Sequence, residues 1–288
     1  MKLPVSSLLL LFSLSGLFVG CSDDAPGAAP LTPQQKHEKA QALLKPSIEL
    51  PASDYKGAIQ LLREAAAQGY VPAMVDLAGI YLGGSKDGSI KKDRIVAFDW
   101  YRKAAEAGSI EAVYSQGFIR YDEGNVEAAV PYLQRAADAG VPEAQYLLGR
   151  ILLQQRDVKA VEYIRKAATS DRAATVARAA YTMAVVYQKG WAGEKIDLPQ
   201  SVEWFKRSAD AGDPRALHLV GLMYIQGAGV EKDEPRGVSM LKLSAGQDYP
   251  AAIKDYITYL QTHDAAAHAD EIRAWVERLK ELSRPESR

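Results

Sequence analysis

The chain has 288 residues, of which 48% are hydrophobic and 25% are charged, and its formal net charge is −1. This is the ordinary balance of a globular protein. No segment gathers lysine and arginine into a basic stripe, so the composition argues against a nucleic-acid partner.

The first 20 residues have the pattern of a secretory signal peptide. Lys2 precedes an apolar run from Leu8 to Val19, which is too short to cross a bilayer. The run ends in Leu-Phe-Val-Gly directly before Cys21, an order that resembles a bacterial lipobox, in which a signal peptidase cuts before the cysteine and lipid is attached to it. Cys21 is the only cysteine in the chain, so it has no disulfide partner. We therefore predict a lipoprotein signal peptide over residues 1–20 and lipidation of Cys21; the alternative is plain secretion.

The residues after Cys21 bear on which membrane would hold the protein. Three acyl chains would anchor it firmly, since a single chain gives only marginal binding. Ser22 favours the outer membrane by the sorting rule of enteric bacteria, whereas Asp23 and Asp24 keep the inner membrane as an alternative. We predict a protein that faces the periplasm, anchored in the outer rather than the inner membrane. Residues 21–34, rich in alanine, proline and aspartate, are predicted to be a flexible tether.

Residues 35–53 are predicted to contain an N-terminal helix and a linker. Thr32 and Pro33 have the residue types of an N-cap and a first helical position, so a short helix is expected to run from there to Leu44. Pro46 and Pro51 then separate this helix from the segment that follows.

A pair of small residues closes a helix-like stretch six times in the chain. The pairs recur at intervals of 31 to 41 residues, as Ala65-Ala66, Ala104-Ala105, Ala136-Ala137, Ala167-Ala168, Ser208-Ala209 and Ser244-Ala245. A period in this range is typical of stacked helical hairpins, in which each pair of helices buries its apolar side only against its neighbours. The sequence therefore predicts an all-α fold, a right-handed superhelical solenoid of antiparallel helix pairs over residues 54–260.

Glycine and proline mark where one helix ends and the next begins. Glycine follows four of the pairs, at a position that favours a left-handed helix end: Gly69, Gly108, Gly140 and Gly212. Proline often comes next, at the first position of the following helix. The pattern leaves a short insertion at residues 172–178.

Two copies carry a longer motif. From Ala216 to Asp233 the chain reads Ala-x4-Gly-x2-Tyr-x2-Gly-x-Gly-Val-x2-Asp, and the copy from Ala73 to Gly108 matches it and continues through Trp100. This motif resembles the Sel-one-like repeat family, relatives of the tetratricopeptide repeats. The copies at 112–140 and 144–171 lack the loop between their helices and look more like tetratricopeptide repeats. The resemblance implies a scaffold that holds other proteins in a complex.

Residues 261–288 are predicted to close the array. The segment from Ala265 to Leu282 is an amphipathic helix whose apolar stripe consists of Ile272, Trp275, Val276, Leu279 and Leu282. We interpret it as the capping helix of the last repeat. The alternative is a helix that binds a partner.

The sequence offers no motif for catalysis, a metal or a cofactor. It contains neither a G-x-S-x-G nucleophile turn nor a phosphate loop of the G-x-x-x-x-G-K-[ST] type. His263 and His268 are five residues apart, whereas two metal ligands on one helical face are four apart. We therefore expect no enzymatic activity, no metal and no cofactor.

Candidate binding residues come from the register of the repeats. In arrays that resemble this one, the first helix of each pair lines a concave groove, and the position two residues after its first small residue faces that groove. Tyrosine stands there in three successive copies, and tyrosine gives contact area at low entropic cost. The alternative is that these tyrosines pack against the neighbouring repeat. With two polar neighbours, the partner-binding candidates are Tyr114, Tyr146, Arg150, Tyr181 and His218.

The function expected from these features is a non-enzymatic periplasmic lipoprotein scaffold that holds one or more envelope proteins. One specific version is an outer-membrane lipoprotein of an exopolysaccharide secretion complex. A second class is a binder or enzyme of cell-wall glycan or polysaccharide, and a third is a secreted factor that binds a host protein.

Overall fold

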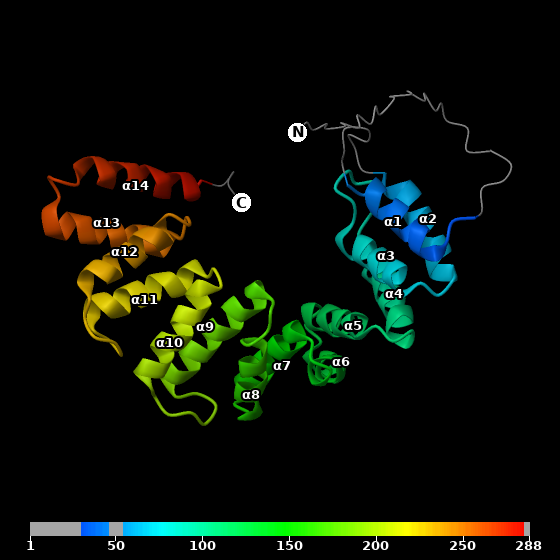
Figure 1. Cartoon of the computed structure of the whole chain (residues 1–288), viewed down its shortest axis with the longest axis horizontal. Coiled ribbons are helices and arrows are strands. Elements are labelled where there is room, and N and C mark those ends of the chain that lie inside the picture. The colour runs from blue at the N-terminus through cyan, green and yellow to red at the C-terminus, as the bar shows by residue number, and fades with distance from the viewer. Residues whose placement is uncertain (1–29, 46–53, 285–288) are drawn as a thin grey trace, which may run out of the picture.

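The computed structural model describes residues 30–45 and 54–284, and within these residues every regular element is an α-helix (Figure 1). The predicted signal peptide, Cys21 and residues 22–29 of the predicted tether lie outside the described residues. The helices are α1 (Pro33–Leu43), α2 (Tyr55–Ala67), α3 (Val71–Gly83), α4 (Arg94–Glu106), α5 (Ile110–Asp122), α6 (Val126–Asp138), α7 (Pro142–Gln154), α8 (Lys159–Ala167), α9 (Ala173–Lys189), α10 (Leu198–Asp210), α11 (Pro214–Gln226), α12 (Glu234–Ala245), α13 (Pro250–Asp264) and α14 (Ala269–Leu282).

Consecutive helices pack as hairpins. From α1 to α12, each odd-numbered helix packs most extensively on the even-numbered helix that follows it, whereas α13 packs more extensively on α12 than on α14; each hairpin also contacts the next one. Figure 1 shows the hairpins following one another along an open arc, with α5, α7 and α9 on its inner side and α6, α8 and α10 on its outer side. The predicted fold class, an all-α solenoid of helix pairs, is confirmed.

Local rules explain where the helices begin and end. Side chains of aspartate, asparagine or serine accept a backbone N–H at the start of seven described helices, from Asp54, Asp93, Ser109, Asn125, Asp197, Asp213 and Asp233. Gly69, Gly108, Gly140 and Gly212 all have positive φ, between 81° and 99°, which ends the preceding helix in the conformation predicted for them. Asp248 takes the same place after α12 with φ 61°.

Small residues allow the helices of a hairpin to cross closely. A Cβ added at Gly149 in α7 would lie 2.6 Å from Ile164 Cγ1 in α8, closer than real side chains approach. Where a repeat carries serine in place of alanine, the buried hydroxyl donates to a carbonyl of a facing helix, as Ser208 Oγ does to the Ala177 carbonyl at 2.7 Å. The pairs of small residues therefore mark helix crossings, and larger side chains fill the space between hairpins.

The array extends further toward the N-terminus than residue 54. Helix α1 begins at Pro33 with Thr32 as its N-cap, as predicted, and it packs on α2 as the first helix of a hairpin. At the other end, α14 lays its predicted stripe against Ala252, Ile253 and Ile257. Both terminal helices are thus members of helix pairs.

Helix α9 is longer than the other first helices. The residues 172–178, which the repeat pattern sets apart as an insertion, contain the beginning of α9, which starts at Ala173. Among residues 30–45 and 54–284, no helix combines the length and the apolar character that a bilayer crossing requires.

Candidate functional site

Three successive first helices, which lie on the inner side of the arc in Figure 1, each carry a tyrosine at the same register. Tyr114 comes from α5, Tyr146 from α7 and Tyr181 from α9, and each is partly buried. One part of each ring therefore packs against the repeats while the rest stays accessible. The structure brings together three of the five residues that the sequence selected, and Arg150 joins them.

Tyr146 lies between two arginines. The guanidinium carbon of Arg150, one turn further along α7, is 5.8 Å from the centroid of the Tyr146 ring, and that of Arg178 on α9 is 5.4 Å from it. Arg178 Nε also donates to the Ala174 carbonyl. Neither guanidinium has a carboxylate partner among the described residues. Two positive charges thus lie beside the Tyr146 ring, and neither forms an ion pair within residues 30–45 and 54–284.

Tyr181, on the repeat that follows Tyr146, contacts an arginine of the next hairpin, and this arginine is itself part of an ion pair. The Arg215 guanidinium carbon lies 4.5 Å from the Tyr181 ring centroid, and the other contact of the ring is edge-on with Phe205. Arg215 binds the buried carboxylate of Asp213 at 2.7 Å. This hydrogen bond raises the pKa of Arg215, and the nearby Tyr181 and Tyr146 hydroxyls raise it further. The Tyr181 ring and the Arg215 guanidinium are therefore in contact across two neighbouring hairpins.

Tyr114 borders the same surface on the other side. Its ring lies 6.1 Å from that of Phe118, which is 40% exposed. Burial raises the pKa of Tyr114, the Glu143 carboxylate raises it as well, and the Arg178 and Arg172 guanidinium groups lower it. Glu143 is paired with Arg172 at 3.2 Å. Glu143 thus pairs with one of the two guanidinium groups near Tyr114, and Arg178, the other, forms no ion pair within the described residues.

We define the inner patch as Tyr114, Tyr146, Arg150, Arg178, Tyr181 and Arg215. Its uncompensated charge is positive, because Asp213 offsets only Arg215. Guanidinium groups bind carboxylates through two parallel hydrogen bonds, and tyrosine supplies flat contact area beside them. The arrangement is therefore suited to holding an extended segment that carries carboxylates.

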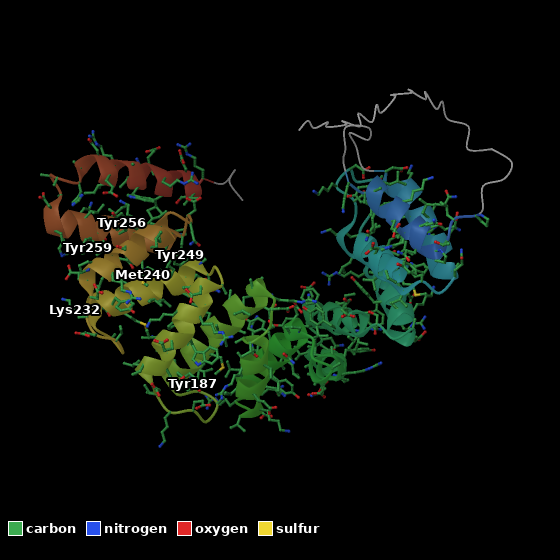
Figure 2. The ribbon with its side chains drawn as sticks, in the orientation of Figure 1. Tyr187, Lys232, Met240, Tyr249, Tyr256 and Tyr259 are labelled. Atoms are coloured by element: carbon green, nitrogen blue, oxygen red, sulfur yellow. The ribbon has the colours of Figure 1, made fainter. Side chains whose placement is uncertain are left out.

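His218 is the predicted residue that the structure does not bring to the inner patch. It is only 7% exposed, its Nε2 lies 2.7 Å from Asp255 Oδ2 on α13, and its ring packs edge-on against Tyr249. Tyr249, labelled in Figure 2, lies where α13 begins. His218 stands at the same register as Tyr146 and Tyr181, which are partly open. At His218, however, residues of the following hairpin cover this position.

A counterpart of this arrangement, which no sequence motif had indicated, lies at the other end of the array. His37 Nε2 on α1 lies 2.8 Å from Asp76 Oδ2 on α3, and its ring packs edge-on against Tyr70. The sequence did contain a signal for this pairing, namely a histidine followed by an aspartate about one repeat later. The spacing is 39 residues at His37 and 37 residues at His218.

Arg178 and Arg215 are the functional candidates that sequence reasoning missed. Each stands directly before the first small residue of its repeat motif, Ala179 or Ala216, where the copies at 112–140 and 144–171 carry glutamate, Glu111 and Glu143. The change from glutamate to arginine at this register was the signal that could have found them. Within residues 30–45 and 54–284, no three His, Cys, Asp or Glu side chains form a group that could hold a metal ion.

Comparisons with family models agree with this architecture. A model described as Sel1 repeat matches residues 37–70, 71–109, 177–213 and 214–249. A model described as plant tetratricopeptide repeats matches residues 91–187. The second match contains the two copies whose inter-helix loop is missing, and the first of the Sel1 matches contains most of α1 together with α2.

Solved structures show the same fold. The Escherichia coli protein c5321, described as a protective antigen of uropathogenic strains with an SLR fold, is 26% identical, with a TM-score of 0.73 over 87% of this chain. This chain spans 54% of the length of that protein. A Sel1 repeat protein from Oxalobacter formigenes is 23% identical, with a TM-score of 0.69, and the match covers 85% of this chain and 99% of that one. The comparison with curated proteins finds no match.

Proposed function

The chain belongs to the Sel1 repeat family, and we propose that it holds a partner protein by an acidic, extended segment that binds the inner patch. Repeat proteins of this kind mediate protein–protein interactions and are generally not enzymes. The observation that carries the proposal is the position of Tyr146 between Arg150 and Arg178, whose charges have no carboxylate partner in the described part of the chain. Carboxylates of a bound segment would complete these contacts.

The site of action that we propose is the bacterial envelope, with the protein anchored by lipid on Cys21 and facing the periplasm, in the outer rather than the inner membrane. The supporting features are the signal-like residues 1–20 and the single cysteine that follows them. One assembly that fits such a scaffold is an exopolysaccharide secretion complex. A secretion operon next to the gene would support this version, and an unrelated neighbourhood would speak against it.

The inner patch is tested by charge reversal. Arg150→Glu combined with Arg178→Glu is expected to weaken binding of a fluorescent oligoglutamate peptide at least about tenfold and to remove in-cell cross-links to partner proteins. Arg207→Glu is the matched control, because its guanidinium carbon lies 5.6 Å from the Trp204 ring on α10, a helix of the outer side. Equal binding by the double variant and the control would refute the proposal.

Two other outcomes would assign the protein to a different class. If the purified protein bound or cleaved peptidoglycan or polysaccharide without a protein partner, the scaffold proposal would be wrong. If the protein were found in the medium with Cys21 unmodified, the anchor would be wrong and a secreted host-binding factor would be favoured. Cys21→Ala is expected to release the protein from membranes and to leave its melting temperature unchanged.

A further inference from the structure

Large apolar side chains are exposed where two neighbouring hairpins turn. Val158, between α7 and α8, is 64% exposed, and Trp191 and Ile196, in the loop between α9 and α10, are 49% and 68% exposed. The two turns touch, since a Cβ added at Gly193 would lie 3.2 Å from Val158 Cγ1. We call Val158, Trp191 and Ile196 the loop tip. Figure 1 shows the loop between α9 and α10 extending beyond the helices, next to α8.

The chain provides its own comparison for this loop. Loops of the same kind follow α3 and α11, and in all three a capping aspartate donates its backbone N–H to a tyrosine carbonyl, from Asp93, Asp197 and Asp233 at 2.7, 2.9 and 2.9 Å. The tyrosine of the α9 loop, Tyr187, and Lys232 of the α11 loop are labelled in Figure 2. The three loops can therefore be aligned with one another, both from the glycine at which each loop begins and from the aspartate at which it ends.

At two of the aligned positions, the α9 loop carries a large apolar residue and the other two loops do not. The residue directly before the aspartate is Lys92 in one loop and Lys232 in another, but Ile196 here. The residue directly after the glycine that ends the first helix is Ser85 or Ala228 elsewhere, but Trp191 here. The folded loop does not require these apolar residues, because its counterparts close in the same way without them.

Positive charge surrounds the loop tip. Four exposed cations near it have no ion-pair partner among the described residues, namely Arg156, Lys159, Lys189 and Lys195. The neighbouring acidic groups are all engaged: Glu194 is paired with Arg165, Glu162 is paired with Lys166, and Asp157 and Asp197 accept backbone N–H groups. Six cations and four carboxylates are thus named at this edge, so its net charge is positive.

We propose that the loop tip docks on an anionic membrane surface. Tryptophan is favoured at the level of lipid headgroups, aliphatic side chains beside it gain from leaving water, and nearby lysine and arginine side chains reach headgroup phosphates. In Figure 1 this loop extends on the outer side of the arc, whereas α5, α7 and α9, which carry most of the inner patch, lie on its inner side, so docking leaves these helices open to a partner. The inference depends neither on the acidic partner proposed above nor on lipid at Cys21.

The test uses the full chain with Cys21→Ala, so that every variant has the same N-terminus and no acyl chain. Ile196→Lys and Trp191→Ala introduce the residues that this chain carries in its other loops, so they are expected to leave the melting temperature unchanged. Binding to vesicles of phosphatidylglycerol and phosphatidylcholine is expected to weaken at least about tenfold in each. Ile95→Lys is the matched control, because Ile95 is 79% exposed on α4, away from the loop tip, and binding should persist.

A second measurement reports on Trp191 directly. Brominated lipids in the same vesicles are expected to quench part of the tryptophan emission, and Trp191→Phe should remove that part. Vesicles of phosphatidylcholine alone, or added salt, should weaken binding, because the cations then lose their anionic partners. If Ile196→Lys and Ile95→Lys bound vesicles equally, or if a photo-cross-linker at position 196 captured only protein in cells, membrane docking would be overturned.

Discussion

His218 Nε2 lies 2.7 Å from Asp255 Oδ2, and this contact joins α11 to α13 across the boundary between two hairpins. His37 and Asp76 make the same contact between α1 and α3 at the other end of the array. In both places a tyrosine at the start of the following first helix packs against the imidazole. The contact therefore connects consecutive repeats near each end, where a solenoid has fewer stacked neighbours to stabilise it.

Loss of this contact should destabilise the array. Asp255→Ala is expected to lower the free energy of unfolding by about 1–2 kcal/mol, because the buried imidazole of His218 loses its hydrogen-bond partner. Asp255→Asn keeps an oxygen of similar position and should cost less. Urea unfolding measures both, with Lys254→Ala on the exposed side of α13 as the control. Equal losses for Asp255→Ala and Lys254→Ala would contradict a stabilising role.

The close crossing of α7 and α8 predicts opposite effects of two identical substitutions. Gly149→Ala is expected to lower the free energy of unfolding by about 1–3 kcal/mol, because the new Cβ meets Ile164. Gly79→Ala in α3 meets no atom within 4 Å, so it should raise that free energy by about 0.5–1 kcal/mol through helix propensity. A stabilising Gly149→Ala would disprove the close crossing. Gly149→Leu should lower the free energy of unfolding more than Gly149→Ala does, because its side chain is larger.

The capping helix is held by an ion pair whose effect should depend on pH. Arg278 of α14 donates two hydrogen bonds to Asp248, at 2.6 and 2.7 Å, and they hold the pKa of that carboxyl below its ordinary value. Such a group stabilises the fold above the pKa of the unfolded chain, about 3.9, and loses this effect as the pH falls through the lower folded pKa.

Asp248→Asn tests this pH dependence. Asparagine also adopts the positive φ of this position, so the change removes mainly the charge. The variant is expected to melt below the wild type at neutral pH and to approach it as the pH falls below about 4. High salt should narrow the difference at neutral pH. A difference that stayed constant from neutral to strongly acidic pH would rule out the ion pair as its cause.

The partly buried tyrosines allow binding and folding to be separated. Tyr146→Ala combined with Arg150→Ala is expected to abolish partner cross-linking with little change in melting temperature, because both side chains border the open surface. A loss of about 3–5 kcal/mol instead would assign Tyr146 to the core, as truncation of a large buried side chain does.

The fold could be predicted from sequence because its rules are local and repeated. Gly69 and Gly108 end helices by their own backbone freedom, Thr32 and Pro33 begin one, and Gly149 permits a close crossing; each acts within a few residues. The N-terminal boundary of the array was harder to predict. The prolines between α1 and α2 indicated a separation, whereas α1 packs on α2 as the first helix of a hairpin. That pairing depends on packing, which no local pattern encodes.

The sequence alone determined the helical hairpins, their register and the tyrosines of the first helices, because a period of one repeat fixes which residues share a face. Tertiary structure alone decided which of those positions stay open. Tyr146 and His218 stand at the same register, yet arginines flank the accessible ring of Tyr146, while Asp255 and Tyr249 close over His218. The physical reason is that exposure at this position depends on side chains of the next hairpin, about one repeat away along the chain.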